Sequence, residues 1–235
     1  MSRYVFLRVF VFSLLAVLGG IYLSSFQPPA SNSLGYPWQI ERLASGHTQV
    51  FKLILGQSSI NDAQLLFKEE AEITLFVPTD IKHKSADSVS GRASAPVVEA
   101  FFSQVKTGGL KARMVMSIDI PENEINALYQ RGVRVATLQS GIRKVTLSDV
   151  DALAVRARPI TSITYLPSIN LSASLIEKRF GPPAAKRADP ESDAIHWLYP
   201  EQGVDIALSE THKEVIQYVE PARFGELVRL LKAVK

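Results

Sequence analysis

Apolar and polar side chains alternate along most of the chain after residue 40. Along residues 110–120 the apolar positions recur every second residue and so share one face of an extended strand: Leu110, Ala112, Met114, Met116, Ile118 and Ile120. Similar short runs, bounded by glycine, proline or polar turn residues, predict further strands. They cover residues 49–56, 71–78, 98–105, 160–167, 194–200, 204–209 and 213–221.

Helical spacing appears in other short segments. In residues 58–67, Ile60, Ala63 and Phe67 recur at intervals of three and four, and a serine at the start can cap the helix. A second helix is predicted to end at Gly181, where glycine and two prolines follow. That second helix covers residues 168–180, and further helices are predicted over 121–131, 149–157 and 222–235.

These elements follow the same order twice. Residues 41–132 and residues 160–235 each run strand, helix, three strands, helix, with a proline between the last strand and the closing helix. Residues 133–159, between them, predict a linker made of a hairpin and a short helix. We therefore expect an α+β fold: a tandem repeat of antiparallel β-meanders with helices packed on one face.

The N-terminal segment has the pattern of a membrane anchor. Arg3 and Arg8 precede an apolar run to Phe26, and the first charge afterwards is Glu41. This order predicts a transmembrane helix over 1–26 with its N-terminus in the cytoplasm. A cleaved signal peptide is the alternative. Residues 27–40 then form a flexible tether, and the implied localisation is single-pass in a bacterial inner membrane with the folded part in the periplasm.

Composition and charge exclude several classes of function. The chain has no cysteine, so disulfides, cysteine-ligated metals and a thiol nucleophile are excluded. Its 26 basic and 23 acidic residues give a formal net charge of only +3, and the basic residues are not clustered. We therefore do not expect nucleic acid as a partner.

Two quoted segments carry a resemblance to known families. "SLIEKRFGPP" followed by "IHWLYPEQGVDIAL", and more weakly "SSINDAQLLF" followed by "AEITLFV", place a helix before a meander that begins with an aromatic strand. This arrangement resembles the repeat of β-lactamase-inhibitor-like proteins and of small outer-membrane lipoproteins that assist β-barrel assembly (the SmpA/OmlA type). The chain departs from the lipoproteins because it has no cysteine to acylate. The resemblance implies periplasmic, non-enzymatic binding or assembly work.

The polar residues do not form a recognisable catalytic or metal-binding motif. The four histidines, His47, His83, His196 and His212, form no close ligand pair. Ser174 precedes a lysine by four residues, one more than the S-x-x-K arrangement has. We expect no enzyme activity, no cofactor and no metal.

Aromatic residues are the better candidates for a functional surface. In residues 194–200, Trp197 and Tyr199 share one face, which either packs in the core or stays open to a partner. Phe101 and Phe102 point to opposite faces of their strand, so each face of the sheet carries one phenylalanine that needs to be covered. These four residues are the predicted partner-binding set.

The sequence thus favours a membrane-anchored, non-enzymatic periplasmic protein that binds an envelope protein and helps assemble, stabilise or inhibit it. The alternative is a carrier of a lipid or small ligand, or an enzyme with an unrecognised site. An apolar pocket would favour the carrier. An acid from the other repeat beside His196 or His212 would favour the enzyme, and an open aromatic sheet face would favour protein binding.

Overall fold

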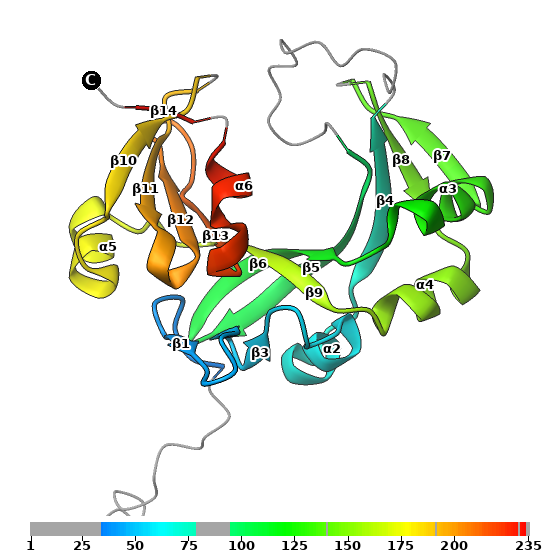
Figure 1. Cartoon of the computed structure of the whole chain (residues 1–235), viewed down its shortest axis with the longest axis horizontal. Helices are drawn as coiled ribbons and strands as arrows, with labels where there is room; N and C mark the ends of the chain where they lie inside the picture. Colours follow the sequence, from blue (N-terminus) through cyan, green and yellow to red (C-terminus); the bar gives the residue numbers. More distant parts are fainter. Residues whose placement is uncertain (1–33, 79–94, 140, 191, 230, 234–235) are drawn as a thin grey trace, which may run out of the picture. The chain divides into compact units, whose positions relative to one another are not determined.

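The computed structural model describes residues 34–78, 95–139, 141–190, 192–229 and 231–233 (Figure 1). Most strands join one antiparallel sheet, which runs, from edge to edge, through β14 (Lys232–Ala233), β10 (Ala185–Ala188), β11 (Ile195–Tyr199), β12 (Val204–Leu208), β13 (Val215–Val219), β9 (Ile160–Pro167), β6 (Leu110–Ile118), β5 (Val97–Thr107), β4 (Glu72–Pro78), β8 (Ile142–Thr146) and β7 (Arg134–Thr137). A small second sheet contains β1 (Ile40–Arg42), β2 (Thr48–Val50) and β3 (Leu53–Ile54).

The helices in the described residues are short, and three of them begin at a capping serine. They are α2 (Ile60–Phe67), α3 (Glu122–Gln130), α4 (Asp149–Arg156), α5 (Ala173–Phe180) and α6 (Phe224–Val228), with single 3-10 turns at Pro200–Gln202 and Pro221–Arg223. Ser59, Ser148 and Ser172 each accept a backbone N–H of the first turn of α2, α4 and α5. The predicted stop of α5 at Gly181 is confirmed, with φ of 84° at that residue.

The expected fold of two meanders with helices on one face is wrong. The fold is mostly β, and its large sheet is continuous because β6 pairs with β9, for example Met114 with Tyr165. Moreover, the strand expected to open the first repeat lies in the small sheet as β2 and β3, whereas its expected counterpart β9 lies inside the large sheet. Two separate meanders would each leave an edge strand with unpaired backbone N–H and C=O groups. When β6 pairs with β9, the groups on both of these edges form hydrogen bonds.

One hydrophobic core spans both halves of the sheet. Phe51, from the turn between β2 and β3, packs between two buried tyrosines: its ring centroid lies 5.4 Å from that of Tyr165 and 5.6 Å from that of Tyr218. The Tyr218 hydroxyl donates to the carbonyl of Pro37 at 2.8 Å. Residues 34–40, expected as the end of the tether, therefore include a packed segment.

The expected transmembrane helix and the inner-membrane localisation are also corrected. Within the part of the chain that the structure describes, no helix combines the length and apolar character needed to cross a bilayer. Residues 1–26, on which that expectation fell, lie outside the described residues.

Candidate functional site

The aromatic pair of β11 lies in the core. Trp197 and Tyr199 are buried against the main hydrophobic cluster. The ammonium of Lys186 lies 3.9 Å from the centre of the Trp197 ring, and the Tyr199 hydroxyl donates to the carbonyl of Gly181 at 3.0 Å. Burial of the ring also raises the pKa of Tyr199 to about 12. Both side chains are thus occupied by contacts within the chain.

The phenylalanine pair of β5 divides between the two faces, as its alternation predicts. Phe102 is fully buried, and its ring meets that of Phe67 edge to face at a centroid distance of 5.1 Å. Phe101 is only half-buried. A partner-binding role for Trp197, Tyr199, Phe101 and Phe102 stays a prediction, and among these four only Phe101 has appreciable exposure.

A histidine and an aspartate meet on the opposite face of the β11–β12 hairpin. His196 Nδ1 lies 2.7 Å from Asp205 Oδ2, and the Asp205 side chain is only 2% exposed. The other carboxylate oxygen, Oδ1, is buried without a hydrogen-bond partner among the described residues. Leu198, Val219 and Phe224 form a small apolar cluster of their own, and alternation places Leu198 on the same face of β11 as His196.

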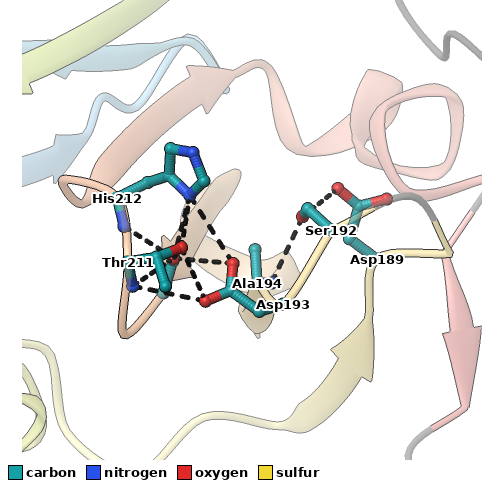
Figure 2. Close-up of polar contacts among 7 residues, drawn as sticks. Asp189, Ser192, Asp193, Ala194, Thr211 and His212 are labelled. Atoms are coloured by element: carbon teal, nitrogen blue, oxygen red, sulfur yellow. Dashed lines mark hydrogen bonds and ion pairs between the residues drawn. The ribbon is translucent and has the colours of Figure 1, made fainter.

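A second polar cluster fixes the turn between β12 and β13 (Figure 2). Asp193 accepts the Ser209 hydroxyl at 2.8 Å, and it accepts both the backbone N–H of Thr211 at 3.3 Å and the Thr211 hydroxyl at 3.0 Å. His212 Nδ1 lies 3.6 Å from Asp193. Serine, histidine and aspartate therefore gather in one exposed turn.

This cluster lacks the geometry of a serine nucleophile. In a catalytic triad the aspartate contacts one ring nitrogen and the serine the other, so that the ring can take the serine proton. Here Ser209 and Asp193 both approach Nδ1 of His212, and the Ser209 hydroxyl donates to the carboxylate. The arrangement instead holds the turn in place.

We expect the Asp193 carboxylate to stabilise this turn in a pH-dependent way. Its hydrogen bond from Ser209, followed by those from Thr211, lowers the pKa of Asp193 from 3.8 to about 2. Because the folded-state pKa is lower, the stabilisation is complete above about pH 4 and is lost as the pH falls through about 2. Asp193→Asn is therefore expected to lower the midpoint of thermal unfolding at pH 6, and the difference from the wild type should shrink between pH 4 and pH 2.

Glu210→Gln is the matched control, since this acid lies in the same turn and its replacement leaves the Asp193 hydrogen bonds in place. A difference between wild type and Asp193→Asn that stays constant down to pH 2 would contradict the assignment.

His196 and His212 do not follow the pattern expected of an enzyme, although another histidine, His47, lies with its Nδ1 3.3 Å from Glu220 Oε1 and so joins the two halves. That pattern joined His196 or His212 to an acid of the other half, whereas each bonds an acid from residues 160–235. In the described part of the chain, no three histidine, aspartate or glutamate side chains form a group suited to a metal ion. The absence of enzyme activity, cofactor and metal stays a prediction.

Among the strands of the large sheet whose side-chain burial the structure describes, β7 differs from the others because all four of its residues are exposed. It ends the sheet order, with β8 on one side and no other described strand on the other. Three exposed apolar side chains lie in or beside it: Val133, Val135 and Leu138, with exposures of 73%, 47% and 41%. This hairpin lies in the predicted linker, outside the predicted partner-binding set, and the apolar residues at 133 and 135 are the signal for it in the sequence.

The register of β7 shows which backbone groups are open. The Leu138 N–H donates to the Ile142 carbonyl at 2.8 Å and closes the β7–β8 hairpin. In an antiparallel pair, hydrogen-bonded residues alternate with residues whose N–H and C=O groups point away. Counting back from Leu138, Ala136 belongs to the bonded set, whereas Val135 and Thr137 direct their backbone groups to the outer edge.

An ion pair fixes the base of this hairpin. Arg131, just before β7, binds the Asp151 carboxylate in α4 through two nitrogens, the shorter contact being 2.7 Å. The hydrogen bond from Arg131 holds the pKa of Asp151 below its usual value. The edge is thus presented by an anchored hairpin.

Comparisons with known proteins add little to this geometry. No model of a known protein family matches the chain, and no curated protein matches it. Among solved structures, it is similar to a DUF4309 family protein (YjgB) from Bacillus subtilis, with a TM-score of 0.36 and 12% identity, over 74% of this chain and 88% of that chain. The resemblance of the quoted segments to the inhibitor-like and lipoprotein repeats stays an expectation.

Proposed function

We propose that this chain is a non-enzymatic binding protein whose partner is another protein, held along the outer edge of β7. The supporting observation is the edge itself: Val135 and Thr137 direct backbone N–H and C=O groups outward from a strand exposed on both faces. An extended segment of a partner would pair with these groups as one more antiparallel strand.

The exposure of β7 gives such pairing a physical advantage. Open strand edges are usually shielded by short length, proline, charge or a covering segment, because they pair readily with other chains. β7 is short and carries Arg134, yet it has Val135 in its middle and exposed Val133 and Leu138 at its ends. An added strand would cover these apolar side chains as well as the backbone groups.

The pre-formed hairpin also reduces the entropic cost of binding. The Arg131–Asp151 ion pair and the β7–β8 ladder already order the residues that would contact the partner. Only the incoming segment loses conformational freedom, which favours affinity for a given contact area. Carriage of a lipid or small ligand, or an enzymatic function, stays the alternative.

Val135→Pro tests this proposal. Proline removes the outward N–H of residue 135 and places its ring on the open edge, while the Ala136 and Leu138 bonds to β8 remain. We expect the variant to keep its thermal unfolding midpoint but to capture about tenfold less partner from an extract of the cells that produce the protein. Hydrogen exchange of the Val135 and Thr137 amides should slow in the wild-type complex.

Val150→Lys is the matched control, because Val150 is also exposed and apolar but lies on α4. The proposal fails if Val135→Pro captures the same proteins in the same amounts as the wild type, or if both variants lose them equally.

A further inference from the structure

We infer that the strand added to β7 is acidic, with a carboxylate facing Arg134. This inference rests on the proposed function, since it names the chemistry of the partner at that same edge. It starts from the charges of the β7–β8 hairpin and of the residues around its base.

Most basic side chains around this hairpin already have partners. Lys144 binds Glu72 at 2.8 Å, and Arg131 binds Asp151. Arg143 donates to the Tyr129 hydroxyl at 2.8 Å, a neutral partner that leaves its charge uncompensated.

Arg134 stands apart from these three residues. Its side chain is exposed and has no hydrogen-bond or ion-pair partner among the described residues. Counting partners among the described residues alone, the edge therefore presents one unpaired guanidinium on β7 itself. A second positive charge without an acid partner in that part of the chain, that of Arg143, lies one strand further in.

The position of Arg134 makes its charge selective. Residues directly opposite each other in an antiparallel pair bring their side chains about 4.5–5.5 Å apart at Cβ, and opposite charges there are favourable. A glutamate facing Arg134 can accept two parallel hydrogen bonds from its guanidinium. A lysine at the same position would instead meet a like charge, so the edge discriminates by repulsion as well as by attraction.

Arg143 extends this preference to the other face of the hairpin. Arg143 lies in β8, directly opposite Thr137 of β7, so the two side chains share a face of the hairpin. Residues 134 and 137 lie on opposite faces of β7. Two acidic residues three positions apart in the added strand would therefore lie toward one arginine on each face.

A second copy of this chain fits the edge less well. Residues 133–139, "VRVATLQ", contain no aspartate or glutamate. Two β7 strands paired with each other would thus leave both Arg134 charges without an acid in the facing strand. Charge complementarity therefore favours a different, acidic chain.

Two synthetic peptides test the inference on the full chain. One is a short alternating valine–threonine strand with glutamates three positions apart, and the other carries lysines at the same places. By fluorescence anisotropy, we expect the glutamate peptide to bind the wild type about tenfold more tightly than the lysine peptide. Arg134→Glu should reverse the preference, whereas Arg223→Glu, at an exposed arginine in the turn before α6, should leave it unchanged. Val135→Pro should weaken both peptides.

The outcomes separate this inference from the proposed function. Equal binding of both peptides, still weakened by Val135→Pro, would overturn the acidic partner and leave strand addition standing. Binding of neither peptide, or binding that Val135→Pro does not change, would overturn strand addition itself. A dimer of the unliganded chain in sedimentation that Val135→Pro abolishes would overturn the acidic partner in favour of a second copy.

Discussion

Phe102→Ala is expected to lower the free energy of unfolding by about 3–5 kcal/mol, the largest effect of any change considered. Phe102 has no exposed surface, and its ring packs edge to face on Phe67 of α2. Its neighbour across the sheet is Met114 of β6, which is also fully buried. Alanine would leave a cavity where the sheet and α2 meet, and such close packing relaxes only in part.

Phe101→Ala is the matched control, because the same residue type is removed one position away on the opposite face. Phe101 is half-buried, so its loss should cost clearly less. Chemical denaturation of both variants gives the comparison. Equal losses for the two variants would show that the core does not lie on the Phe102 face of β5.

Gly203→Ala is expected to be the next most destabilising change. Gly203 follows the 3-10 turn after β11, and its φ of 68° lies in the left-handed region. An added Cβ would also lie against the carbonyl oxygen of Val219, a backbone atom that cannot move aside without disturbing β13. The conformational cost is about 1–2 kcal/mol, and overpacking adds about 1–3 kcal/mol.

Gly109→Ala separates these two contributions. Gly109 has a φ of 81°, but its Cβ would meet no atom within 4 Å. This control should therefore lose only the conformational part. Thermal unfolding measures both variants, with about 2–4 °C expected per kcal/mol for a chain of this size. A Gly203→Ala variant as stable as Gly109→Ala would contradict the close approach of the turn to β13.

Local features of this chain are readable from its sequence because the interactions that fix them span only a few residues. The start of α2 depends on Ser59 and Asp62, which cap one another's backbone groups within a single turn. The ends of α5 and of the 3-10 turn depend on Gly181 and Gly203, where glycine adopts a positive φ.

The arrangement of strands is different, because pairing joins segments far apart in the chain. Apolar and polar residues alternate with the same period in every strand, so this pattern does not reveal which strands are neighbours. It is equally compatible with β6 as the last strand of a separate meander and with the observed pairing of β6 with β9. It also gives no signal for β10, in which Lys186 and Arg187 stand side by side and no apolar residue recurs every second position, yet β10 pairs with β11. Membrane insertion was a separate expectation, and it fell on residues outside those described.

The candidate site shows the same division. Alternation determined that Trp197 and Tyr199 share a face, but only the tertiary structure decided that the core covers that face. The sequence likewise predicted a hairpin within residues 133–159. β7 ends the sheet with open backbone groups because β8, its one neighbour among the described strands, pairs with β4 on the other side. Whether an edge is open depends on what every other strand pairs with, and no local pattern carries that information.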